Sequence, residues 1–229
     1  MKKHYPWLWF DADGTLFDFN RAEGIALRNA FQCVNTPFKD EYLDVYRHIN
    51  QQLWQALERQ EITSEALRLR RFELLLENTQ LTCAPDQMSA AYVEQLAICA
   101  ELIDGAYELL FTLQGKCQIA IVTNGLKNVQ RSRMALSPIR TFIVDMVISE
   151  EVGAAKPKAA YFDAAFARFG YPPKTDVLII GDSLTADMRG GVDYGIDTCW
   201  YNPAGETRPA DLPITHEIAH LSDLITILG

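Results

Sequence analysis

Residues 7–19 read WLWFDADGTLFDF, and this stretch decides the fold. Four apolar residues run directly into two aspartates, Asp11 and Asp13. An unbroken apolar run that ends at a turn is typical of a strand buried on both faces of a parallel sheet. The acids then stand at the C-terminal end of the strand, where such sheets form ligand sites. We expect a cation beside them, because neighbouring carboxylates repel each other and Mg²⁺ prefers carboxylate and phosphate oxygens.

The composition is that of a globular protein and narrows its partners. The chain has 229 residues, of which 48% are hydrophobic and 22% charged, enough for one large domain or a domain with an insertion. The formal net charge of −9 argues against a surface for nucleic-acid polymers or anionic membranes. The apolar run before Asp11 is too short for a signal peptide or a membrane span, so we expect a cytoplasmic protein.

The cysteines are odd in number and widely spaced, which favours buried free thiols over disulfides or a zinc site. They are Cys33, Cys83, Cys99, Cys117 and Cys199.

Helical periodicity follows the first strand without any strand candidate between its segments. The expected helices are 20–34, with Asn20 as N-cap, then 39–59, 64–78 and 86–101. We therefore expect residues 19–100 to form a helical cap domain, inserted into a catalytic core made of residues 1–18 and 101–229.

From residue 118 onward, strands and helices alternate. The expected strands are 118–122, 146–149, 177–181, 198–201 and 214–218, and the helices are 104–114, 126–135, 158–169, 185–194 and 222–228. This alternation predicts an α/β fold, a Rossmann-like, doubly wound parallel sheet.

Polar residues follow several of these strands or their loops. They are Asp11 with Asp13, Thr123 with Asn124, Lys156, and Asp182 with Asp187. Singly, each pattern has an ordinary explanation as a turn, an exposed loop or a helix start capped by Asp182 or Ser183. Together they are more specific, because right-handed crossovers bring all C-terminal strand ends to one edge of the sheet. Acids, a lysine and a hydroxyl at one edge suit phosphoryl transfer.

Four motifs in this order resemble those of the haloacid dehalogenase-like phosphatase superfamily, over essentially the whole chain. They are DADGT at 11–15, TNG at 123–125, KP at 156–157 and GDSLTAD at 181–187. The resemblance implies that Asp11 is the nucleophile that forms an aspartyl-phosphate. It implies that Asp13 protonates the leaving oxygen and then activates water.

The same resemblance implies a phosphate site and a metal site. Thr123, Lys156 and the backbone of Asn124 would hold the phosphoryl oxygens. Asp182 would bind Mg²⁺ together with the Asp11 carboxylate and the Asp13 carbonyl, and Asp187 would support the metal through the second layer of contacts or a water. The insertion matches the family's helical cap, a lid over the substrate.

The family also contains dehalogenases, which lack the second aspartate of the first motif. Asp13 is present here, so the acid that the leaving group of a phosphate ester needs is in place. Hydrolysis of a phosphate monoester is expected because it is the commoner activity in the family. A sugar-phosphate phosphatase or a phosphomutase keeps the same motifs and stays open as an alternative. A non-catalytic module that binds phosphate or a partner is a further alternative.

Three segments resemble the bacterial noncanonical pyrimidine nucleotide 5′-nucleotidases. They are LWQALERQEITSEALRLRRFE at 53–73, ISEEVGAAKP at 148–157 and GGVDYGIDTCWYN at 190–202. We therefore expect a nucleoside 5′-monophosphate as the substrate. Trp54 and Arg71 are candidates for contact with the base, and the ordinary alternatives are helix core for Trp54 and a solvated charge for Arg71.

Two further patterns do not fit their usual functions. HEIAH at 216–220 has the histidine spacing of zinc proteases, but the segment is expected to be a strand and offers no third ligand. GDSL at 181–184 resembles a serine esterase motif, but it lies late in the chain and lacks the partner Asp-x-x-His pair.

Overall fold

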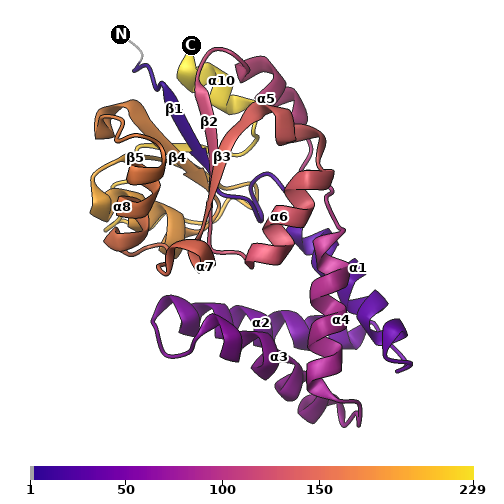
Figure 1. Ribbon diagram of the computed structural model, residues 1–229. Helices are drawn as coiled ribbons and strands as arrows, with labels where there is room; N and C mark the ends of the chain where they lie inside the picture. The colour runs from indigo at the N-terminus through magenta and orange to yellow at the C-terminus, as the bar shows by residue number, and fades with distance from the viewer. Residues whose placement is uncertain (1–2) are drawn as a thin grey trace. The chain divides into compact units, whose positions relative to one another are not determined.

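The computed structural model describes residues 3–229, and the chain divides into two compact units. One unit joins the residues up to Phe19 with Ala100–Gly229, and the other unit is Asn20–Cys99. Figure 1 colours the chain by residue number, so the second unit is the indigo to magenta group of helices α1 to α4.

The first unit is built on a parallel sheet. Its strands are β1 (Trp7–Phe10), β2 (Gln118–Thr123), β3 (Ile143–Ile148), β4 (Val177–Gly181), β5 (Asp197–Tyr201) and β6 (His216–Ile218). Within residues 3–229 these six strands follow the order β3-β2-β1-β4-β5-β6 (Figure 1). The predicted α/β fold with a Rossmann-like parallel sheet is confirmed. The direction of winding reverses beside β1, so the ends of β1, β2 and β4 meet where such sheets bind ligands.

Helices cover both faces of this sheet. They are α5 (Ala106–Leu113), α6 (Lys127–Leu136), α7 (Ser149–Val152), α8 (Ala159–Arg168), α9 (Arg189–Tyr194) and α10 (Asp223–Leu228), with short turns η1 (Pro138–Phe142), η2 (Lys174–Asp176) and η3 (Leu184–Met188). Alternate strand residues enter two apolar clusters. Phe10 and Ile180 pack with α5 and α10, whereas Trp9 and Ile179 pack with α8. Each fully buried side chain of this kind contributes roughly 1.5–3 kcal/mol.

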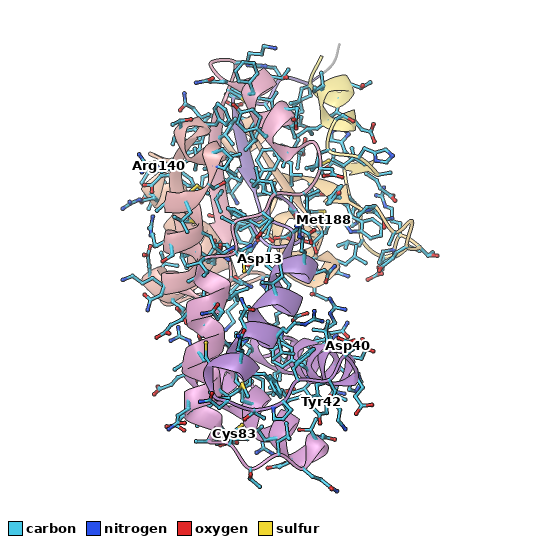
Figure 2. All side chains as sticks on the ribbon, turned by 90° about the vertical axis from the view of Figure 1, so that its right-hand side faces the viewer. Asp13, Asp40, Tyr42, Cys83, Arg140 and Met188 are labelled. Atoms are coloured by element: carbon cyan, nitrogen blue, oxygen red, sulfur yellow. The ribbon has the colours of Figure 1, made fainter. Side chains whose placement is uncertain are left out.

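The second unit is a group of four helices within the described part of the chain. They are α1 (Phe19–Cys33), α2 (Glu41–Glu58), α3 (Ser64–Thr79) and α4 (Pro85–Ala97). Three aromatic rings meet in its interior, since Tyr46 lies 5.5 Å from Phe72 and 5.3 Å from Tyr92 between ring centroids. Tyr42, which is labelled in Figure 2, stacks at 5.7 Å on Phe31. Helix α3 begins after Thr63, whose hydroxyl accepts a hydrogen bond from the Ala66 amide at 3.1 Å.

Several predicted boundaries are wrong, each for a local reason. Helix α1 begins at Phe19, so Asn20 lies in its first turn instead of capping it. Helix α4 ends at Ala97 rather than at 101, because Leu102 pairs with Phe17 in an antiparallel bridge. Strand β3 begins three residues earlier than predicted, at Ile143, since an edge strand carries exposed and polar residues that weaken its apolar pattern.

The predicted helix 185–194 is divided. Its first part is the π-type turn η3, in which the Ser183 carbonyl accepts hydrogen bonds from the amides of both Asp187 and Met188, at 3.1 and 3.0 Å. Helix α9 follows only from Arg189. Such turns are frequent at functional sites because they redirect one side chain. Here the redirected side chain is that of Asp187.

All five cysteines are thiols outside any disulfide bond, as predicted, but their predicted burial is only partly right. Cys99 and Cys199 are buried, Cys83 and Cys117 are half-buried, and Cys33 is exposed at the end of α1. An apolar neighbourhood in the sequence does not fix which side of a helix a residue occupies. None of the helices in the described residues is long and apolar enough to cross a membrane.

Candidate active site

A buried lysine ties together the ends of three strands. The Nζ atom of Lys156 donates hydrogen bonds to Asp11 Oδ1, Asp187 Oδ1 and the Val122 carbonyl, each at 2.6 Å. Lys156 is 1% exposed, so its charge has no access to bulk water. The three acceptors come from the segments after β1, within β2 and after β4. The lysine therefore fixes the two carboxylates at the edge of the sheet where the sequence placed them.

Three carboxylates gather around this lysine. Carboxylate oxygens of Asp11, Asp182 and Asp187 all lie within 4.8 Å of one another. When all three carboxylates are ionised, the single ammonium of Lys156 balances one of the three negative charges and leaves the other two without a cation. A divalent cation with a preference for oxygen ligands fits this excess. The described residues therefore provide a donor set suitable for Mg²⁺.

The electrostatics agree with this interpretation. Burial raises the pKa of Asp11 well above its usual range, although Lys156 opposes the shift. Burial, assisted by the Asp187 carboxylate, raises the pKa of Asp182 to about 7. Burial alone would lower the pKa of Lys156, but Asp11 and Asp187 raise it above its ordinary value. Carboxylates raised in this way gain most from a cation that stabilises their ionised form.

Two motif glycines make room for these acids. A Cβ atom on Gly14 would lie 2.6 Å from Asp182 Oδ2, and Gly14 also has a positive φ of 79°. A Cβ atom on Gly181 would lie 2.2 Å from Asp187 Oδ2. Real Cβ contacts are never this short, so a larger residue at either position would displace a carboxylate. The glycines of DADGT and GDSLTAD are explained by their neighbours across the site.

The TNG motif has a positioning role at the end of β2. The hydroxyl of Thr123 accepts a hydrogen bond from the Gly125 amide at 3.0 Å, and Thr123 is buried. The side chain of Asn124 bonds to the backbone of Lys156 twice, through Nδ2 to the carbonyl at 2.9 Å and through Oδ1 to the amide at 2.8 Å. Asn124 therefore fixes the loop that carries the lysine.

Asp13 points to a different set of partners. Its two carboxylate oxygens accept hydrogen bonds from Arg133 and Gln130 on α6. Asp13 is labelled in Figure 2 and follows the C-terminal end of β1. Sequence reasoning missed Gln130 and Arg133. The available signal was their spacing, since residues three apart share one face of a helix and this helix follows the TNG motif directly.

The two unusual sequence patterns have structural explanations. Ser183 is the N-cap of η3, because its hydroxyl accepts a hydrogen bond from the Ala186 amide at 3.0 Å. His216 lies on β6 and His220 follows that strand, so the histidines are not on a helix. Trp200 supports the site from β5, where its indole Nε1 donates to the Asp182 carbonyl at 3.0 Å.

The two candidates for base contact lie in the second unit. Trp54 is half-buried on α2. The interpretation of Arg71 as a solvated charge is wrong, because Arg71 is 2% exposed and its guanidinium lies 4.7 Å from the Tyr92 ring centroid. It also donates to Asn50 Oδ1 at 3.4 Å. The sequence suggested that Arg71 lies on a helix surface, but its side chain is buried within the four-helix unit.

Comparisons with known proteins identify a family that this chain matches. A family model described as a haloacid dehalogenase-like hydrolase matches residues 7–195. The chain is 38% identical over 227 residues to the HAD-hydrolase YfnB of Bacillus subtilis, covering 99% of this chain and 97% of that protein. The crystal structure of YfnB bound to magnesium matches with a TM-score of 0.94 at 37% identity, covering 99% of this chain and 100% of that chain.

Two relatives have names that state a substrate class. The pyrimidine 5′-nucleotidase YjjG of Escherichia coli is 34% identical over 224 residues, which cover 98% of each protein. The pyrimidine 5′-nucleotidase PynA of Streptococcus pneumoniae is 32% identical over 225 residues, which cover 98% of this chain and 95% of that protein.

Proposed function

This chain belongs to the haloacid dehalogenase-like hydrolases, as its motifs predicted, and from that premise we propose that it is a Mg²⁺-dependent phosphatase acting on a nucleoside 5′-monophosphate. The observation that carries the proposal is the cluster of Asp11, Asp182 and Asp187 around the buried Lys156. Such a cluster can bind the Mg²⁺ that accompanies a phosphoryl group, and one of its carboxylates can attack phosphorus.

In the first step, an oxygen of Asp11 attacks phosphorus while the bond to the leaving oxygen breaks. Asp13 donates its proton to that oxygen, so the alcohol leaves neutral. Lys156 and the Thr123 hydroxyl stabilise the negative charge on the phosphoryl oxygens. Asp11 is suited to the attack because its backbone amide is fixed by the Ile180 carbonyl at 2.8 Å and its side chain by Lys156.

In the second step, water attacks the aspartyl-phosphate. Asp13 now takes a proton from that water, and the bond between Asp11 and phosphorus breaks. Inorganic phosphate is released and both aspartates return to their starting forms.

The metal ion would be held by the carboxylates of Asp11 and Asp182 and by the Asp13 carbonyl, with Asp187 supporting them. When bound, Mg²⁺ neutralises charge on the phosphoryl oxygens and lowers the repulsion between the nucleophile and the phosphate. Asp187 contributes through Lys156, to which it is bonded, and through the Ser183 amide at 3.2 Å.

The choice of a nucleotide is supported by the names of two relatives, each of which covers nearly the whole chain. We propose residues 19–100 as the cap that selects the substrate, with Trp54 and Arg71 as the candidates for contact with the base. The half-buried Trp54 offers a ring for stacking on the base. Arg71 is 2% exposed, so its Nε and Nη2 atoms, which lack a hydrogen-bond partner among the described residues, would bind the carbonyl groups of a pyrimidine only after a rearrangement that uncovers them.

A substrate panel tests the proposal. The purified protein is assayed with uridine and thymidine 5′-monophosphates, adenosine 5′-monophosphate, sugar phosphates and p-nitrophenyl phosphate, with Mg²⁺ and with EDTA. We expect the highest kcat/KM for the pyrimidine nucleotides and loss of all turnover in EDTA. Faster turnover of sugar phosphates would replace the nucleotide assignment, and activity that survives EDTA would contradict the metal requirement.

A further inference from the structure

Helix α6 holds the carboxylate of Asp13 from two directions. Arg133 Nη1 donates to Asp13 Oδ1, and Gln130 Nε2 donates to Asp13 Oδ2 at 2.5 Å. The two donors are three residues apart, so they project from the same face of α6. With one donor on each oxygen, the plane of the carboxylate is fixed.

The two donor side chains are buried, whereas the carboxylate that they hold is partly exposed. Gln130 is 1% exposed and Arg133 is 0% exposed, whereas 24% of the Asp13 side chain stays accessible. The Arg133 guanidinium lies 4.5 Å from the Phe17 ring centroid. Its Nε and Nη2 atoms have no hydrogen-bond partner among residues 3–229. A buried arginine with unused donors is costly for stability, so its pairing with Asp13 points to function rather than to folding.

A third residue of the site supports the same arrangement. A Cβ atom on Gly125 would lie 2.1 Å from Gln130 Nε2, so a larger residue there would displace the Gln130 amide from its contact with Asp13. The last residue of the TNG motif therefore serves Gln130, which in turn reaches Asp13.

Only the amide nitrogen of Gln130 is used in this contact, since its Oε1 atom has no hydrogen-bond partner in the described part of the chain. An unused acceptor on a buried side chain is costly, as are the unused donors of Arg133. The contact with Asp13 is therefore the polar interaction for which this glutamine is placed.

We propose that Gln130 and Arg133 are positioning residues that orient Asp13 for proton transfer; this rests on the function proposed above. As the bond from phosphorus to the leaving oxygen breaks, the Asp13 proton passes to that oxygen, and Asp13 later regains a proton from the attacking water. An acid held in one orientation transfers its proton without a search through rotamers.

Two substrates with different leaving groups distinguish a positioning role from a general structural effect. p-Nitrophenolate leaves readily without a proton, whereas a nucleoside alkoxide needs one. We expect Arg133→Met and Gln130→Met to lower kcat/KM for a nucleoside 5′-monophosphate by about 10- to 100-fold, within the usual range for general acid catalysis. For p-nitrophenyl phosphate, kcat/KM should stay within about threefold of wild type. Arg133→Lys, which retains a donor, should recover part of the loss.

A double-mutant cycle with Asp13→Asn gives the second readout. When Asp13 cannot transfer a proton, Arg133→Met should cost little more, because both changes remove the same step. Arg131→Met is the matched control, since Arg131 lies on the same helix but pairs with Glu151 at an exposed position. It should leave both substrates unchanged.

Equal losses with both substrates, or full additivity with Asp13→Asn, would overturn the positioning role. If Arg133→Met fails to fold, Gln130→Met decides the question by the same comparison. Failure of the underlying function is distinct: an unmutated protein without Mg²⁺-dependent phosphatase activity, or an Asp13→Asn variant with normal kcat/KM for the nucleotide, would contradict the proposed function itself.

Discussion

Lys156 Nζ lies 2.6 Å from Asp11 Oδ1, and both side chains are almost completely removed from solvent. The same ammonium lies 2.6 Å from Asp187 Oδ1. The lysine therefore compensates buried negative charge in the folded protein. In the proposed function it also binds the phosphoryl oxygens.

Replacement of this lysine should affect stability and activity together. Lys156→Met leaves Asp11 and Asp187 without their shared cation, and the expected loss is about 3–5 kcal/mol in the free energy of unfolding. Urea unfolding measures this loss, and added Mg²⁺ should restore part of it because the metal compensates the same carboxylates. Lys127→Met, at an exposed position on α6, is the control for loss of one lysine. A Lys156→Met variant as stable as wild type would show that the carboxylates need no compensation.

A single methyl group should separate Asp187 from this lysine. In Gly181→Ala, the new Cβ atom would lie 2.2 Å from Asp187 Oδ2, so the carboxylate must move. We expect weaker Mg²⁺ binding, by roughly 10- to 100-fold as for other changes that disturb the support of a metal ligand. Isothermal titration with Mg²⁺ measures this change.

The control for that substitution is another glycine. Gly24 lies on α1, where a Cβ atom would be 3.5 Å from the nearest heavy atom, the Cδ2 atom of Leu43. Gly24→Ala should leave Mg²⁺ binding unchanged and stabilise the protein by about 0.4–1 kcal/mol. Equal Mg²⁺ affinity in Gly181→Ala and Gly24→Ala would contradict the proposed role of the carboxylate at position 187.

The helical unit carries a buried acid with its own pH dependence. Glu23 is 3% exposed and accepts hydrogen bonds from Arg47 Nε at 3.1 Å and Asn50 Nδ2 at 3.0 Å. Burial raises the pKa of Glu23, against the opposing effect of these donors. At a pH between the unfolded and the folded pKa, Glu23 is therefore protonated in the folded state and ionised in the unfolded state. The resulting stabilisation is fully present below the unfolded pKa and is lost as pH rises through the folded pKa.

Glu23→Gln removes this pH dependence. The free energy of unfolding of the variant, relative to wild type, should therefore increase as pH rises above about 4, the ordinary pKa range of a glutamate. Urea unfolding at several pH values measures it, with Glu65→Gln as the control for loss of an exposed carboxylate. A relative stability that falls over the same range would mean that Arg47 and Asn50 outweigh burial.

The sheet and the meeting of the strand ends could be predicted from the sequence, because they depend on local patterns and a general rule. The apolar runs before Asp11 and at 177–181 identify parallel strands, and right-handed crossovers place their ends at one edge. That reasoning was enough to bring Asp11, Lys156 and Asp182 to one place.

The contacts made by helices could not be predicted in the same way. Which side of α6 faces the site depends on how that helix packs on the sheet. The spacing of Gln130 and Arg133 puts them on one helix face, but it does not show that this face meets Asp13. The same holds for Arg71, which follows Arg70 in a segment rich in charge and whose side chain is nevertheless buried. The turn η3 escaped prediction because it arises from the bonds of Asp187 and the Ser183 carbonyl.

The central claim is that Asp11 is the nucleophile, and trapping the phosphorylated enzyme tests it most directly. In Asp13→Asn, hydrolysis of the aspartyl-phosphate should be slow, while p-nitrophenyl phosphate can still phosphorylate Asp11 because its leaving group needs no proton. Rapid quenching and mass spectrometry should then find one phosphoryl group per chain, located on Asp11 and absent in the Asp11→Asn variant. Phosphorylation at another residue, or full turnover by Asp11→Asn, would contradict the account.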